Sequence, residues 1–161
     1  MRRLSVTALA IAGLGTCAVA YADTAPYSVP GLLMGSPGAD HLRGTPGRDT
    51  VRSGAGNDTI AGGKGNDNID AGAGDDTVLA GPGDDFVKGG DGNDVLHGAS
   101  GSDRIGAGHG RDVVQGGPGD DRIYTVDGQH DTVSCGPGQD QVIADRGLDS
   151  VDASCEVVLP R

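Results

Sequence analysis

Residues 62–70 read GGKGNDNID, and residues 89–97 read GGDGNDVLH. Residues 116–124, which read GGPGDDRIY, repeat the same nine positions again. Each copy has glycine at its first, second and fourth positions, aspartate at its sixth and an aliphatic residue at its eighth. A short fixed period of this kind is the signature of a solenoid, in which each unit stacks on its neighbours.

The period continues unbroken between residues 35 and 124. Aspartate recurs every nine residues, at Asp40, Asp49, Asp58, Asp67, Asp76, Asp85, Asp94, Asp103, Asp112 and Asp121. An aliphatic residue follows each aspartate by two positions, and a glycine precedes it by two. After Asp121 the period slips by one residue, and Asp131, Asp140 and Asp149 continue it in the new phase.

Each unit is expected to combine a glycine-rich turn with a very short strand whose aliphatic residue points inward. One turn reverses the chain, so two units make one coil. The sequence therefore predicts an all-β fold, a parallel β-roll or β-helix solenoid with two repeats per coil. Alternate aspartates should then form two columns, one at each edge, with a spacing of roughly 4.8 Å.

Stacked carboxylates about 5 Å apart repel one another unless a cation lies between them. The turns bring backbone carbonyl groups to the same edges, and all of these are hard oxygen ligands. Such ligands suit calcium, whereas zinc prefers nitrogen or sulfur and magnesium demands tighter octahedral geometry. The pattern therefore predicts multiple Ca²⁺ sites.

The units resemble the hemolysin-type, or RTX, calcium-binding nonapeptide Gly-Gly-x-Gly-x-Asp-x-aliphatic-x. The resemblance implies a β-roll in which Ca²⁺ is held between coils by the ten in-phase aspartates from Asp40 to Asp121. It also implies that preceding glycines supply carbonyl ligands, and the candidates are Gly56, Gly65, Gly74, Gly83 and Gly92. Ser36 and Thr45 replace the second glycine, so the best sites are expected between Gly54 and Asp94.

Many proteins of that family are toxins or proteases with a separate effector domain, and the resemblance does not extend to those activities. The four histidines do not form a metal or catalytic cluster by their spacing, and no nucleophile motif is present. A non-enzymatic protein is therefore expected, and a small hydrolase lacks any supporting motif. The net charge of −11 argues against nucleic acid and anionic lipid as partners. Such acidity is also typical of disordered chains, which we expect of the cation-free state.

The N-terminus has the pattern of a secretory signal peptide over residues 1–22. Arg2 and Arg3 precede an apolar run, and Ala20-Tyr21-Ala22 supplies the small-x-small cleavage pattern. We expect cleavage after Ala22 and secretion, with no transmembrane segment in the mature chain because the apolar run is short. Cys135 and Cys155 would then remain, and a disulfide is the expectation for an exported protein. Two free thiols are the alternative.

The expected organisation beyond the signal is a spacer or N-terminal cap over residues 23–34, regular repeats over 35–124, and degenerate repeats with a disulfide-stapled cap over 125–161. The leading hypothesis is a secreted calcium-binding repeat protein that folds when Ca²⁺ is held between its stacked turns. The alternative is a cell-envelope adhesion or interaction module in which calcium is purely structural. The sequence identifies neither a protein nor a glycan partner.

Overall fold

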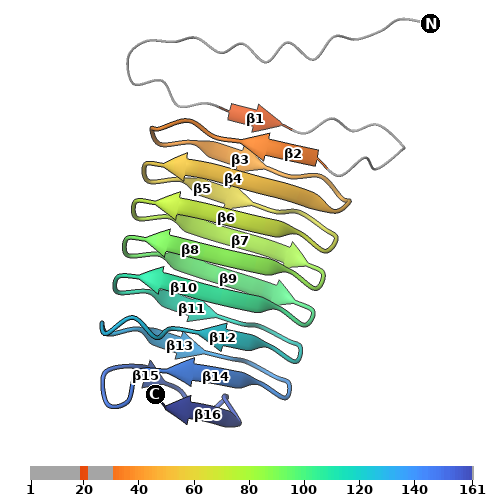
Figure 1. Ribbon diagram of the computed structural model, residues 1–161. Coiled ribbons are helices and arrows are strands. Elements are labelled where there is room, and N and C mark those ends of the chain that lie inside the picture. Colours follow the sequence, from red (N-terminus) through yellow and green to blue (C-terminus); the bar gives the residue numbers. More distant parts are fainter. Residues whose placement is uncertain (1–18, 22–30, 161) are drawn as a thin grey trace, which may run out of the picture.

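The computed structural model describes residues 19–21 and 31–160, and every regular element in those residues is a β-strand (Figure 1). The strands form two parallel eight-stranded sheets, which we call the odd sheet and the even sheet after their strand numbers. The odd sheet contains β1 (Val19–Tyr21), β3 (His41–Arg43), β5 (Thr59–Ala61), β7 (Thr77–Pro82), β9 (Val95–Ser100), β11 (Val113–Gln115), β13 (Thr132–Ser134) and β15 (Ser150–Val151). The even sheet contains β2 (Gly31–Met34), β4 (Asp49–Ala55), β6 (Asn68–Ala73), β8 (Phe86–Asp91), β10 (Arg104–His109), β12 (Arg122–Tyr124), β14 (Gln141–Ala144) and β16 (Val157–Pro160).

Consecutive strands alternate between the two sheets, so the chain winds as a solenoid with two units in each coil. Val51 on β4 pairs with Ile69 on β6, which in turn pairs with Val87 on β8. Each partner lies 18 residues further along the chain, which is two nine-residue units. The predicted fold, an all-β parallel solenoid with two repeats per coil, is confirmed.

The core is a single layer of aliphatic side chains between the two sheets. The eighth residue of each unit, from Leu42 to Ile123, is buried, and the row continues through Val133 and Val142. Alanines such as Ala71 and Ala107 fill the space beside it. Burial of one such aliphatic side chain contributes about 1.5–3 kcal/mol, and each unit has only one. The hydrophobic core per residue is therefore thin.

The solenoid begins before the regular aspartate pattern does. Strand β2 lies in the segment expected as a spacer, pairs with β4, and places Leu33 in the core in register with Val51. Strand β1 pairs with β3. The rest of the predicted signal peptide and of the spacer, residues 1–18 and 22–30, lies outside the described residues.

The one-residue slip is absorbed between β12 and β13. Val113 pairs with Thr132 and Arg122 with Gln141, a separation of 19 residues instead of 18. The insertion thus leaves Val133 and Val142 in the core. The predicted disulfide is confirmed, because Cys135 after β13 is bonded to Cys155 with 5.2 Å between their Cα atoms.

Candidate metal centre

The in-phase aspartates lie in two columns at the edges of the coil, where the turns lead into the strands. Within each column, Oδ1 of one aspartate accepts a hydrogen bond from the backbone N–H of the aspartate one coil earlier. The N–H of Asp58 donates to Asp76 at 2.8 Å, and the N–H of Asp67 donates to Asp85 at 2.7 Å. This ladder fixes each carboxylate in one orientation.

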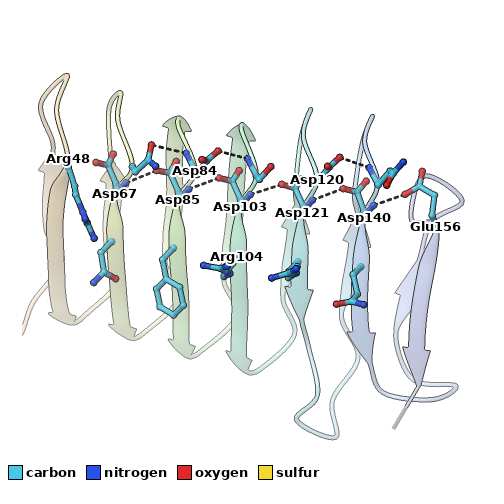
Figure 2. Close-up of a pocket in the computed structure, with 17 residues that line it drawn as sticks. Arg48, Asp67, Asp84, Asp85, Asp103, Arg104, Asp120, Asp121, Asp140 and Glu156 are labelled. Carbon is cyan, nitrogen blue, oxygen red and sulfur yellow. Dashed lines mark hydrogen bonds between the residues drawn. The ribbon is translucent and has the colours of Figure 1, made fainter.

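We call the columns the odd and even columns after the sheets whose strands they precede. The odd column contains Asp40, Asp58, Asp76, Asp94, Asp112, Asp131 and Asp149. The even column contains Asp49, Asp67, Asp85, Asp103, Asp121 and Asp140, and Glu156 closes it. Figure 2 shows this column from Asp67 to Glu156. The slip in the sequence does not interrupt either column, since the backbone of Asp112 donates to Asp131 and that of Asp121 to Asp140.

The second oxygen of these carboxylates has no partner over most of the stack. Among the described residues, Oδ2 is buried without a hydrogen bond at Asp58, Asp67, Asp76, Asp85, Asp94, Asp103, Asp112, Asp121, Asp131 and Asp140. Burial of a charged oxygen without a compensating partner is costly. Each column therefore presents a row of unsatisfied anionic oxygens that a cation would complete.

The first two units differ at this oxygen from the units of Asp58 to Asp140. The backbone N–H of Thr45 donates to Oδ2 of Asp49 at 2.6 Å, and the N–H of Ser36 donates to Oδ2 of Asp40. In the unit of Gly63, by contrast, the corresponding N–H donates to the Ala80 carbonyl of the next coil. The units in which Ser36 and Thr45 replace the second glycine thus satisfy their own carboxylates.

The first glycine of a unit lies where a carboxylate and a carbonyl converge. A Cβ atom on Gly62 would lie 2.7 Å from Oδ2 of Asp67 and 2.5 Å from the carbonyl oxygen of Ala80 in the next coil. A side chain at Gly62 would have to displace one of these two oxygens, although Ser53, Ala71, Ala80 and Ala107 occupy the same position in other units. At Gly62, the absence of a side chain lets the carboxylate oxygen and the carbonyl oxygen approach the same point of the turn.

The fourth-position glycines line the same turns and have backbone conformations that favour glycine. Gly65 has φ of 110° and Gly83 has φ of 150°. A Cβ atom on Gly65 would lie 2.7 Å from the carbonyl carbon of Gly47, and the Gly65 carbonyl in turn faces Gly83. Gly56, Gly74 and Gly92 have positive φ in the same way, so these turns stack backbone on backbone.

Burial raises the pKa of the column carboxyls from Asp67 to Asp140 above the usual value of 3.8. It raises the pKa of Asp67, Asp94, Asp103 and Asp131 to about 7, and that of Asp76, Asp85 and Asp121 to about 6. The backbone hydrogen bond to each carboxylate lowers its pKa, and neighbouring carboxylates raise it further. Near neutral pH these groups therefore take up either a proton or a cation.

The donor set consists of oxygen atoms. Among the described residues, no three His, Cys, Asp or Glu side chains come close enough together to hold a metal by themselves. Any bound cation therefore needs backbone carbonyl ligands in addition to the aspartates. Mixed carboxylate and carbonyl oxygens suit Ca²⁺, and the absence of nitrogen or sulfur ligands disfavours zinc.

Two buried carboxylates of this kind, Asp131 and Asp140, were not among the predicted ligands. The signal that points to them is the nine-residue phase that resumes after the slip. The histidines do not join the columns: His41 and His97 lie on strands of the odd sheet, on its outward side.

A family model described as the RTX calcium-binding nonapeptide repeat (4 copies) matches residues 34–69, 70–105 and 102–133. These matches extend over residues 34–133, which is more than half of the 161 residues. They include the ten aspartates from Asp40 to Asp121 and also Asp131. No curated protein sequence matches the chain.

Proposed function

Because the chain belongs to the RTX calcium-binding nonapeptide repeat family, we propose that it is a secreted protein that needs several bound calcium ions to fold. The observation that carries this proposal is the row of buried, unpartnered Oδ2 atoms along both columns. The matched family is a calcium-binding one and not a catalytic one, and we propose no reaction for this chain.

The proposed ligands are the in-phase aspartates together with backbone carbonyls of the turns. Each aspartate from Asp58 to Asp121 would contribute its free Oδ2, and Asp131 and Asp140 would extend the two rows. The carbonyls of Gly56, Gly65, Gly74, Gly83 and Gly92 are the proposed neutral ligands, because these turns stack directly on one another. Asp40 and Asp49 would hold calcium less tightly, since Ser36 and Thr45 already donate to them.

Calcium would make folding favourable for two reasons. It would neutralise carboxylates that are stacked one coil apart and buried, in a chain with a net charge of −11. It would also bridge successive coils, each of which adds only a thin layer of aliphatic side chains. A ligand that binds the folded state but not the unfolded state stabilises the fold by mass action. The metal-free chain should accordingly be expanded.

The proposed location is outside the cell, with residues 1–22 removed. No helix in the described residues is long and apolar enough to cross a membrane. Cleavage after Ala22 would yield a protein that begins at Asp23 and would remove β1 from the start of the odd sheet. N-terminal sequencing of the exported protein checks this assignment, and an intact Met1 on extracellular protein would refute it.

Calorimetric titration of the purified protein tests calcium binding itself. We expect several calcium ions per chain, with dissociation constants on the order of 10⁻⁴–10⁻³ M, the range of extracellular modules. Magnesium should give little heat, because it demands octahedral geometry and dehydrates reluctantly. Absence of calcium uptake at millimolar concentration, or equal binding of magnesium, would contradict the proposal.

The alternative function, a cell-envelope adhesion or interaction module, is favoured by one observation. The outer face of the even sheet carries large apolar and basic side chains that the calcium sites do not use. This face does not decide whether calcium is purely structural, but it does indicate a partner.

A further inference from the structure

The outer face of the even sheet gathers large apolar side chains that the fold leaves exposed. Among the exposed large hydrophobic residues of the described part, four point outward from this sheet: Leu32, Met34, Phe86 and Tyr124. Phe86 and Tyr124 are also the only aromatic residues within residues 31–160. Phe86 and Tyr124 line one hollow, whereas Leu32 and Met34 lie three strands away from Phe86, on β2. Contiguous apolar patches on a soluble surface mark interaction sites.

The same face is basic, although the chain as a whole is acidic. At the seventh and ninth positions of the units on β4 to β14, four residues are cations: Arg52, Lys88, Arg104 and Arg122. One residue at those positions, Asp70, is acidic, and its carboxylate lies 3.7 Å from Nζ of Lys88. The outward positions of this sheet therefore carry a net positive charge, while exposed carboxylates such as Asp84 and Asp120 lie on the adjacent turns.

The apolar and basic residues occupy neighbouring positions in the register of the sheet. Phe86, Arg104 and Arg122 are in register on β8, β10 and β12, and so are Lys88, Gly106 and Tyr124. The two rows advance by one strand spacing, about 4.8 Å. Nothing lies within 4 Å of where a Gly106 side chain would begin, and this gap opens a hollow of about 730 Å³ between the neighbouring side chains.

The opposite face of the molecule has a different character. The seventh positions of the odd sheet carry the β-branched residues Thr59, Thr77, Val95, Val113 and Thr132. On the strands of the odd sheet within residues 31–160, Arg43 is the only Lys or Arg residue. The repeat pattern alone does not require this asymmetry, because the same nine positions build both sheets.

We propose that the outer face of the even sheet docks on an anionic lipid surface. A bilayer is flat and extended, and so is this face, whose strands stay in register from β2 to β14. Interspersed basic and apolar side chains are what binding in the headgroup region requires. Lys88, Arg104 and Arg122 pair with headgroup phosphates around the hollow, while the apolar side chains reach the boundary of the acyl chains.

The net negative charge of the chain would argue against an anionic partner only if charges on all parts of the surface contributed to the interaction. Exposed charges more than about 8 Å apart are largely screened at physiological salt, so the local charge of the face decides the interaction. The even column runs beside this face, and a common groove is lined by Asp85 and Asp103 together with Phe86 and Arg104 (Figure 2). Calcium on this column reduces the nearby repulsion, which then comes only from exposed carboxylates of the groove such as Asp84 and Asp120. This step rests on the proposed function, and docking is therefore calcium-dependent.

Vesicle co-sedimentation tests the inference, with far-UV circular dichroism of the same samples as a record of folding. With calcium, the protein sediments with vesicles of phosphatidylcholine mixed with phosphatidylglycerol, and little sediments with phosphatidylcholine alone. The variant Lys88→Gln/Arg104→Gln/Arg122→Gln weakens this binding about fivefold for each cation removed. Its matched control, Arg43→Gln/Lys64→Gln/Arg111→Gln, makes the same change in charge away from the face and binds as the unaltered protein does.

The apolar contribution has its own pair of variants. Phe86→Thr/Tyr124→Thr weakens vesicle binding, whereas Leu79→Thr/Val113→Thr on the odd sheet leaves it unchanged. Threonine suits a strand, so these variants keep the fold.

Three outcomes in calcium-folded protein overturn the inference. The first is no vesicle binding, or equal binding to neutral vesicles. The second is full binding by the Lys88/Arg104/Arg122 variant, which would assign the binding to calcium bridging at the columns. The third is retention on immobilised polygalacturonate without vesicle binding, which would assign the face to an acidic glycan. If calcium instead fails to induce folding, it is the proposed function that fails, and the circular dichroism record separates the two cases.

Discussion

At the scale of single residues, the two oxygens of each in-phase aspartate have different roles. Oδ1 accepts the backbone N–H of the preceding coil and orients the carboxylate, as in the bond from Asp76 to Asp94 at 2.9 Å. In the aspartates from Asp58 to Asp140, Oδ2 is buried and has no hydrogen-bond partner. One atom therefore serves the fold and the other is free for a ligand. The nine-residue period of the sequence reveals the aspartate but does not distinguish its two oxygens.

Replacement of a central aspartate should weaken calcium binding. Asp76→Asn keeps the size of the side chain but removes the charge from the middle of the odd column, where two neighbouring coils share it. We expect the calcium concentration at half-binding to rise on the order of tenfold, since ligand charge sets affinity at such sites. Asp91→Asn removes an equal charge from an exposed position outside the columns and should have little effect. Equal shifts in calcium titrations of the two variants would mean that the carboxylates act only as diffuse charge.

Acid should oppose calcium and stabilise the metal-free fold. The pKa of Asp67, Asp94 and Asp103 is raised to about 7 and that of Asp76 and Asp85 to about 6, chiefly by burial. The folded chain thus binds protons that the unfolded chain releases above about pH 4. This stabilisation is fully present below the unfolded pKa and is lost as the pH rises through 6 to 7.

The raised pKa values of these carboxyls lead to two expected results. The metal-free protein should gain β structure when it is acidified from above pH 7 towards pH 4. In the presence of calcium, the half-binding concentration should rise as the pH falls from about 7 to 6, because protons compete for the same oxygens. A half-binding concentration that does not change over this interval would exclude the buried carboxylates as the ligands.

At the scale of the structural element, the turn is what the repeat specifies most strictly. A Cβ atom on Gly62 would meet both the Asp67 carboxylate and the Ala80 carbonyl, whereas one on Gly106 would meet nothing within 4 Å. Gly62→Ala should therefore destabilise the calcium-bound fold by about 1–3 kcal/mol through overpacking. Gly106→Ala should be close to neutral. Thermal unfolding in saturating calcium compares the two, and equal effects would show that the turn glycines are not needed for close approach.

The disulfide should matter only for the last coils. It closes a loop over a sequence separation of 20 residues, beyond the insertion between β12 and β13. Its loss in Cys135→Ala/Cys155→Ala should lower local stability by about 3 kcal/mol. Hydrogen exchange should accelerate in β13 to β16 and stay unchanged in β6 and β8, because coupling in a solenoid acts mainly between neighbours. Uniform acceleration along the chain would contradict this expectation.

The sequence predicts the elements where the period is strict and fails where it is broken. The regular spacing of aliphatic residues from Leu42 to Ile123 was enough to predict the strands and their stacking into two sheets. Each turn reverses the chain, so two units make one coil. Strand β2 was not expected, since its unit has Gly31 where an aspartate would stand, yet Leu33 still has the aliphatic phase. The ladder of carboxylate to backbone bonds could not be predicted either, because it depends on the exact stacking of turns.

At the scale of the whole molecule, the fold is a stack of coils with a thin apolar core and two rows of buried carboxylates. Such a stack has few contacts between residues that are distant along the axis, so its stability is a sum of nearest-neighbour terms. In this protein the buried, unpartnered Oδ2 atoms occur at every coil from Asp58 to Asp140. A cation at each interface would therefore act on the entire stack.

The central claim is that calcium converts an acidic, expanded chain into this solenoid. Far-UV circular dichroism of the protein without residues 1–22, during a calcium titration from a chelated start, tests it most directly. We expect a disordered spectrum in chelator and a cooperative gain of β signal at millimolar calcium, with magnesium ineffective at the same concentration. A full β spectrum in chelator that calcium does not alter would contradict the account.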